Sequence, residues 1–188
     1  MPQGIILAAG TASRAHTNKL LLEFKGRFLI GHAIDGMAPF VSRIFVVTGH
    51  YHQELAAALA HEPKVTLIHN PDYEQGMFSS VLKGVAALND DFFILPGDCP
   101  FVNHETYEAL LHGQGPIRVP TFQGRSGHPM YIGHELIPAL LKEPVQSNLR
   151  VFRDRYPYER IMTEDPRIND DIDTIEDYEK IAACLRKE

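Results

Sequence analysis

The sequence predicts a three-layer α/β/α sandwich on a mostly parallel, mixed sheet. Up to Gly115, short apolar runs alternate with helical patterns, which is the order of right-handed βαβ units. These runs are rich in β-branched and aromatic residues and apolar on both faces, as parallel strands covered by helices must be. The length of 188 residues, 44% of them hydrophobic, fits one domain over residues 1–188 with a sizeable core.

The elements follow in order along the chain. Buried strands are expected at residues 4–7, 43–48, 65–69 and 92–96, and helices at 29–37, 52–60, 79–88 and 104–111. Residues 117–121 and 128–132 resemble two strands joined by a turn at 122–127, a pair that commonly adds antiparallel strands to such a sheet. Residues 156–160 are expected to form a solvated loop or an edge strand. A final helix over 175–185 starts at a capping box of Thr174 and Asp177.

Charge and composition exclude several classes of function. The chain has 18 Lys and Arg against 24 Asp and Glu, a net charge of -6, which argues against general binding to nucleic acid or anionic membranes. No apolar run approaches the roughly 18 residues that a membrane span needs. Cys99 and Cys184 make no metal-binding spacing, and no signal-peptide pattern precedes the first strand. We therefore expect a cytoplasmic protein.

The distribution of charge is uneven. Residues 1–30 carry four basic side chains and one acidic, about +3 (4 minus 1), whereas residues 164–188 carry four basic and nine acidic, about -5 (4 minus 9). A basic amino-terminal loop and an acidic carboxyl-terminal segment are compatible with a metal-bound nucleotide.

Ligands of open α/β sheets bind outside the carboxyl ends of the strands, so the loops at those ends are the expected ligand contacts. The loop at residues 8–19 is rich in small residues and carries Arg14 and Lys19. Exposed backbone N–H groups and two cations suit a phosphate, although a tight strand-to-helix turn with solvated cations has the same composition. The loop is neither a Walker loop nor the dinucleotide fingerprint, because Gly10 stands alone.

Carboxylates follow at two places on the same predicted edge. Asp98 comes directly after the strand at 92–96, where it could ligate Mg²⁺ or cap a turn before Pro100. Three carboxylates lie just before the last helix, at Asp170, Asp171 and Asp173. They could stabilise the start of that helix through its dipole, or they could bind a cation that relieves their mutual repulsion.

Two further segments carry polar groups, and each segment allows a ligand-binding and a structural interpretation. Residues 76–80 open the helix after the third strand, and their hydroxyls and amides could contact a base or a phosphate, or cap the helix. Gly127, His128 and Pro129 could position a substrate, or His128 could be structural.

Taken together, five motifs resemble the MobA-like NTP transferase family, and within it most nearly the molybdenum cofactor cytidylyltransferases. They occur in the family's order at residues 7–21 (LAAGTASRAHTNKLL), 70–84 (NPDYEQGMFSSVLKG), 97–102 (GDCPFV), 124–132 (GRSGHPMYI) and 171–178 (DIDTIEDY). The first departs from the family's pattern, because Ala15-His16 replaces a Met-Gly pair. The resemblance implies a Rossmann-like fold of the nucleotide-diphospho-sugar transferase type.

The resemblance also implies an activity: transfer of a nucleotidyl group from an NTP to a phosphorylated acceptor, here molybdopterin or molybdenum cofactor, with release of pyrophosphate. It makes Arg14, Lys19 and Asp98 the catalytic residues, and Asp98 with Asp173 the ligands of Mg²⁺. Catalysis of this kind is mostly positioning and charge neutralisation, and an ionised phosphate acceptor needs no general base. The implied nucleotide contacts are Leu7, Ala8, Ala9, Gly10, Thr11, Lys19, Gly76, Ser79 and Ser80, and the implied acceptor contacts are Gly127, His128 and Pro129.

The nucleotide is expected to be CTP. Guanylyltransferases of the family tend to carry Leu-Ala-Gly-Gly, whereas Ala9 gives Leu-Ala-Ala-Gly here, and its Cβ would narrow the base pocket.

Three alternatives remain at this point. The acceptor could be a sugar phosphate, an isoprenoid precursor or another phosphorylated metabolite. His16 leaves open a non-catalytic carrier that delivers molybdenum cofactor to an apo-molybdoenzyme. A dinucleotide-dependent oxidoreductase is the weakest alternative, because the fingerprint and a proton donor are missing.

Overall fold

The computed structural model describes residues 1–10, 18–172 and 174–185. Its main sheet has the strand order β10-β7-β9-β6-β1-β4-β5, and β8 pairs with β7 outside this path. β9 and the short β8 run antiparallel to their neighbours, and the other pairs of this sheet are parallel. The predicted mixed, mostly parallel sheet is therefore confirmed.

The strands are β1 (Gln3–Ala8), β2 (Glu23–Phe24), β3 (Arg27–Phe28), β4 (Ile44–Thr48), β5 (Val65–His69), β6 (Phe92–Pro96), β7 (Ile117–Phe122), β8 (Arg125–Ser126), β9 (Met130–Ile132) and β10 (Glu159–Met162). The α-helices are α1 (Leu29–Met37), α2 (His52–Ala58), α3 (Met77–Val85), α4 (His104–His112), α5 (Ile137–Leu140), α6 (Leu149–Arg153) and α7 (Ile175–Leu185). Short 3₁₀ turns are η1 (Lys19–Leu21), η2 (Ala38–Phe40), η3 (Tyr73–Gln75), η4 (His134–Leu136) and η5 (Pro166–Asn169).

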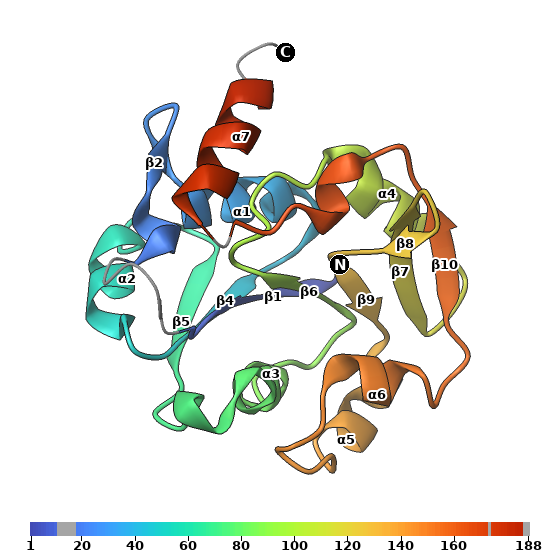
Figure 1. Ribbon diagram of the computed structural model, residues 1–188. Helices are drawn as coiled ribbons and strands as arrows, with labels where there is room; N and C mark the ends of the chain where they lie inside the picture. Colours follow the sequence, from blue (N-terminus) through green and yellow to red (C-terminus); the bar gives the residue numbers. More distant parts are fainter. Residues whose placement is uncertain (11–17, 173, 186–188) are drawn as a thin grey trace.

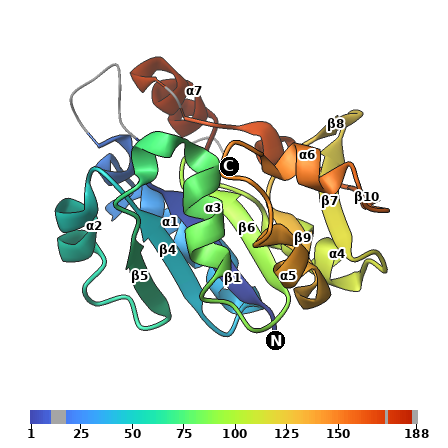
Figure 2. The same cartoon turned by 90° about the horizontal axis from the view of Figure 1, so that it is seen from below.

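Helices cover both faces of the sheet (Figures 1 and 2). α1, α2 and α4 bury apolar side chains on one face, around Ile34, Leu55 and Tyr107. α3, α5 and α6 do so on the other, and Phe92 and Phe152 belong to that second cluster. The three-layer arrangement is confirmed. Among the described residues, no helix is long and apolar enough to cross a membrane.

Several boundaries differ from the predicted ones for local reasons. α3 begins at Met77 because Gly76 has a φ of 105°, a backbone conformation that residues with a side chain rarely adopt, and so ends the preceding turn. β9 begins at Met130 because Pro129 has no N–H for the ladder. The predicted pairing of the two late strands is confirmed by the register Ile117 to Ile132, although the turn between them also holds β8.

The carboxyl-terminal segment returns to the sheet and then to the α1 side. Residues 156–160 lead into β10, an edge strand that runs parallel to β7. The predicted capping box begins α7, since Asp177 Oδ2 accepts from the N–H of Thr174 at 2.9 Å and the N–H of Asp177 donates to Thr174 Oγ1 at 3.1 Å. Tyr178 anchors α7 to the β2–β3 hairpin, because its hydroxyl donates to the carbonyl of Glu23 at 2.6 Å.

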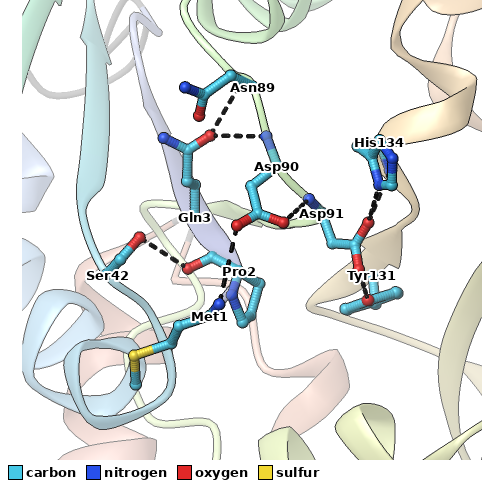
Figure 3. Close-up of polar contacts among 9 residues, drawn as sticks. All are labelled: Met1, Pro2, Gln3, Ser42, Asn89, Asp90, Asp91, Tyr131 and His134. Carbon is cyan, nitrogen blue, oxygen red and sulfur yellow. Dashed lines mark hydrogen bonds and ion pairs between the residues drawn. The ribbon is translucent and has the colours of Figure 1, made fainter.

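A polar network closes the amino-terminal end of the sheet (Figure 3). Asp91, just before β6, accepts from the Tyr131 hydroxyl at 2.5 Å and from the backbone N–H of His134 at 2.9 Å. Among the described residues, Asp90, Asp91 and His134 form the one group of three or more potential metal ligands that lie close together. Because the carboxylate of Asp91 already joins β9 to the loop before β6, we assign this network a structural role.

Candidate active site

Two loops meet at the carboxyl ends of the central strands β1 and β6. The N–H of Gly97 donates to the carbonyl of Leu7 at 2.9 Å, and a Cβ on Gly97 would lie 3.0 Å from that same oxygen. A glycine therefore allows the loop after β6 to approach β1 closely, and the next residue, Asp98, is held at the centre of this edge.

The first of two cavities lies over the end of β1 and the start of α3, and has a volume of about 530 Å³. It brings together most of the predicted nucleotide contacts with the predicted metal ligand Asp98. Its lining consists of Leu7, Ala8, Ala9, Gly10, Asn18, Lys19, Leu20, Tyr73, Glu74, Gly76, Met77, Ser80, Pro96 and Asp98.

Lys19 and Asp98 form an ion pair within this cavity. Lys19 Nζ lies 2.9 Å from Asp98 Oδ2, and the two side chains are 29% and 26% exposed. Lys19 begins η1, which is fixed by Asn18, whose side-chain oxygen accepts from the N–H of Leu20 at 3.1 Å. The chain thus places an ammonium group and a carboxylate, 79 residues apart in sequence, at one point of the cavity wall.

The start of α3 forms the wall opposite these charges. Asn70, which is 1% exposed, donates from Nδ2 to the hydroxyls of Ser79 and Ser80, each at 2.9 Å. Ser79 in turn donates to the carbonyl of Gly76 at 2.8 Å and lies outside the set of lining residues, whereas Ser80 lines the cavity. The positive end of α3, at Gly76 and Met77, faces the cavity and favours an anion there.

A second cavity of about 570 Å³ shares Leu7, Met77, Pro96 and Asp98 with the first. It extends over β9 toward β8 and α6. The other lining residues are Ile94, Cys99, Val119, Arg125, Ser126, Gly127, His128, Met130, Leu149, Arg150, Arg153, Asn169 and Asp171. Asp98 therefore stands where the two cavities meet.

The predicted acceptor residues are placed by contact with η5. The N–H of His128 donates to the carbonyl of Ile168 at 2.8 Å, and a Cβ on Gly127 would lie 2.6 Å from the carbonyl carbon of the same residue. Gly127 and His128 line the second cavity, while Pro129 is buried beneath it. The His128–Pro129 peptide bond is cis.

Burial sets the protonation of two groups in the second cavity. It holds the pKa of His128 below its usual value, although the negative charges of Asp98 and Asp171 act in the opposite direction. His128 is therefore a neutral imidazole at pH 7. Burial also raises the pKa of the Cys99 thiol far above its usual value, so this cysteine is not a nucleophile.

The second carboxylate of the site comes from the segment before α7. The N–H of Ile172 donates to the carbonyl of Asp98 at 2.9 Å, which holds the neighbouring Asp171 beside the second cavity. Asp165, 3% exposed, anchors this segment by accepting from the N–H of Asn103 at 2.8 Å and from the Thr106 hydroxyl at 2.9 Å. Carboxylate oxygens of Asp98 and Asp171 are donors that suit a hard cation such as Mg²⁺.

Three predicted site residues, Thr11, Arg14 and Asp173, lie outside the described residues. The cavities also include side chains that were not predicted from the sequence. The motif at residues 70–84 contains three of them, Tyr73, Glu74 and Met77, and so could have indicated that they line the cavity. Arg125 likewise lies inside the motif at residues 124–132, whereas Arg150 and Arg153 come from α6, which is too short to show a period.

The fold and the paired cavities define an α/β protein that can hold two ligands on either side of one carboxylate. The model of the MobA-like NTP transferase domain matches residues 4–160. The chain belongs to the MobA-like NTP transferase family, which is a class of nucleotidyltransferases.

Relatives share sequence along most of the chain. It is 32% identical to a molybdenum cofactor cytidylyltransferase of Escherichia coli K12, covering 93% of this chain and 92% of that one. It is 31% identical to a nicotine blue oxidoreductase of Paenarthrobacter nicotinovorans, covering 92% of each. It is 28% identical to a probable molybdenum cofactor guanylyltransferase of Bacillus cereus, covering 77% and 76%.

Among solved structures, a nucleotidyl transferase of Methanothermobacter thermautotrophicus superposes with a TM-score of 0.84. The match has 24% sequence identity and covers 100% of this chain and 99% of the other. This likeness confirms the predicted fold of the nucleotide-diphospho-sugar transferase type.

Proposed function

We propose that this protein transfers CMP from CTP to the phosphate of molybdopterin and releases pyrophosphate. The observation that carries the proposal is the position of Asp98, at the junction of two cavities of similar size and 2.9 Å from Lys19. A group-transfer enzyme needs two ligands held with their reacting atoms about 3–3.5 Å apart. Two cavities meeting at one charged residue satisfy that need.

The first cavity is assigned to CTP. The cytidine would lie between the end of β1, at Ala8 and Ala9, and the start of α3, at Gly76 and Ser80. Its triphosphate would follow Gly10 and Lys19, with Thr11 and Arg14 completing the phosphate contacts as the family resemblance implies. Ser79 acts indirectly in this arrangement, because its hydroxyl and that of Ser80 share the same Asn70 donor.

The second cavity is assigned to the acceptor, whose phosphate would lie beside Asp98. One acceptor oxygen forms a bond to the α-phosphorus of CTP, and the bond from that phosphorus to the pyrophosphate oxygen breaks. A phosphate monoester is largely ionised near pH 7, so no side chain has to remove a proton. Burial lowers the pKa of His128 and so makes its imidazole a weak base, and the buried Cys99 thiol stays protonated, which agrees with a transfer that needs no general base.

The chain's own groups neutralise the charge of this transfer. Lys19 balances the phosphate oxygens, and Asp98 with Asp171 or Asp173 would hold Mg²⁺. When bound, the ion would supply positive charge at the reacting phosphates. The Lys19–Asp98 pair keeps both side chains in place when no nucleotide is bound.

The preference for CTP rests on Ala9. This residue is 8% exposed, lines the first cavity, and has its carbonyl oxygen 2.7 Å from where a Cβ on Gly49 would lie. The peptide at Ala9 is thus packed against the loop after β4 and has little room to move away from a larger base.

The proposal is tested by pyrophosphate release from the purified protein with Mg²⁺, molybdopterin and each of CTP, GTP, ATP and UTP. Release that depends on molybdopterin and is fastest with CTP supports it. Release with a sugar phosphate or another phosphorylated metabolite in place of molybdopterin would reassign the acceptor. Binding of molybdopterin without any release would instead support the non-catalytic carrier.

A further inference from the structure

Two arginines of the second cavity have no acidic partner among the residues that the structure describes. Arg125 on β8 and Arg150 on α6 are exposed, line this cavity, and form no ion pair with any of the described residues. The third arginine, Arg153, differs, because its guanidinium lies 2.7 Å from Asp154 and 4.6 Å from the centre of the Tyr158 ring. Arg153 is thus held in place, whereas Arg125 and Arg150 can bind a ligand.

The part of the second cavity that is lined by β8 and α6 therefore carries unbalanced positive charge. Asp98 is paired with Lys19, Arg153 with Asp154, and His128 is neutral. Asp171 is the remaining acidic group of the lining, and it is one of the two candidates to hold the metal with Asp98. The charges left for the acceptor itself are those of Arg125 and Arg150.

The two arginines line only the second cavity, whereas Asp98 belongs to both. The attacking phosphate has to lie at the shared part, near Asp98, to reach the α-phosphorus. A volume of about 570 Å³ is that of a site for a whole small molecule and much larger than a single phosphate needs. The body of the acceptor therefore extends from Asp98 toward β8 and α6.

From this arrangement we infer that Arg125 and Arg150 determine acceptor specificity by binding a second anionic group, separate from the phosphate that attacks. Arginine suits this role because its planar fork makes two parallel hydrogen bonds to an anion and keeps its charge at every working pH. The inference rests on the proposed function. It narrows the acceptor to molecules with at least two anionic sites, and molybdopterin, which carries a dithiolate besides its phosphate, is one.

The test uses the full chain and the variants Arg125→Gln, Arg150→Gln and the double variant. Arg43→Gln is the matched control, since Arg43 is also exposed and without an ion pair among the described residues, but lies at the opposite end of the sheet, before β4. The KM for molybdopterin should rise about 10-fold in each single variant, the scale of one charge-assisted hydrogen bond, while the KM for CTP changes less than 2-fold. Arg43→Gln should match the wild type.

A second measurement separates the two anionic groups. Dephosphorylated molybdopterin, used as a competitor of molybdopterin, reports on the contacts other than those of the attacking phosphate. Its inhibition constant should rise in the arginine variants as much as the KM for molybdopterin does. An unchanged inhibition constant would show that the arginines bind the attacking phosphate, and the inference would be overturned.

Direct binding of molybdopterin, followed by its pterin fluorescence without CTP, keeps this inference apart from the proposed function. If the wild type binds molybdopterin tightly, the arginine variants bind it weakly, and none releases pyrophosphate, the proposed function fails while the inference stands. Turnover that is equal in wild type and both variants overturns the inference and leaves the function intact. A wild type that does not bind molybdopterin overturns both.

Discussion

Lys19 Nζ lies 2.9 Å from Asp98 Oδ2 and joins the first 3₁₀ turn to the loop after β6. Both side chains are more than a quarter exposed, so solvent screens the pair and its contribution to folding is at most about 1 kcal/mol. Its importance is positional, because it holds a cation and a carboxylate where the first and second cavities meet.

Replacing Asp98 should separate activity from stability. We expect Asp98→Asn to lower Mg²⁺-dependent turnover by at least about 100-fold, the scale of losing one preorganised electrostatic group, and to change the free energy of unfolding by less than about 1 kcal/mol. Initial rates and urea unfolding measure the two effects. Asp35→Asn breaks a similar ion pair, Arg27–Asp35 at 2.7 Å, away from both cavities, and should keep full activity. Near-native turnover of Asp98→Asn would refute the metal assignment.

Replacing Lys19 should affect the triphosphate more than the nucleoside. Lys19→Gln is expected to weaken CTP binding about 10-fold and cytidine binding less than 2-fold, because the ammonium group would contact phosphate oxygens. Isothermal titration of both ligands measures the difference, with the exposed Lys142→Gln as a control. Equal losses for CTP and cytidine would contradict a phosphate contact.

The base preference should depend on one methyl group. Ala9→Gly removes the Cβ that is proposed to narrow the pocket, so the ratio of kcat/KM for CTP to that for GTP should fall on the order of 10-fold. The ratio is its own control, because general damage lowers both values together. A wild-type preference for GTP, or an unchanged ratio in Ala9→Gly, would show that Ala9 does not determine the base preference.

His128 should make stability depend on pH. Its pKa is lower in the folded protein than the ordinary value of about 6.5, so the unfolded chain binds the proton more readily. Stability contributed by the neutral imidazole is complete above about pH 6.5 and is lost as the pH falls through the folded pKa. Urea unfolding at pH 7.5 and pH 5.5 should therefore show a larger loss for the wild type than for His128→Asn. Parallel losses in the two proteins would show that His128 is not the group responsible.

Gly127 should tolerate no side chain. Because a Cβ there would overlap the backbone of Ile168, Gly127→Ala should lower the free energy of unfolding by about 1–3 kcal/mol and weaken acceptor binding. Gly36→Ala is the control: its Cβ would meet Val102 O at an ordinary 3.5 Å within α1, so stability should rise by about 0.5–1 kcal/mol. Chemical denaturation compares the two variants, and a neutral Gly127→Ala would argue against the close contact.

Much of the fold was predictable because most strands of the sheet are continuous apolar runs. β4, β5 and β6 lie at the predicted positions within a residue, and α1 matches at both ends. The expectation that residues 65–69 form a buried strand was wrong, because β5 is at the edge of the sheet and its side chains are only partly buried. Elements of two to five residues, such as β8, α5 and α6, were not predicted, since so few residues show no period and are held by tertiary contacts. α3 begins at Met77, two residues before its predicted start at Ser79, because Gly76 takes the position directly before the helix.

The candidate site was predictable where its residues lie in the loops after the carboxyl ends of the strands. Ala8, Lys19, Gly76 and Asp98 do meet in one cavity, because parallel strands bring their carboxyl ends to one edge. Arg125 lies inside the motif at residues 124–132, beside the predicted acceptor contacts, whereas Arg150 reaches the second cavity only through the packing of α6, a short element without a local pattern.

The central claim is that the two cavities hold a nucleotide and a phosphorylated acceptor for group transfer at Asp98. It is tested most directly by incubating the protein with Mg²⁺, molybdopterin and CTP labelled at the α-phosphate, and following the label by mass spectrometry. The account predicts labelled CMP joined to the acceptor phosphate, with one pyrophosphate released for each product and almost none with Asp98→Asn. Label that stays in CTP while molybdopterin is bound would contradict it.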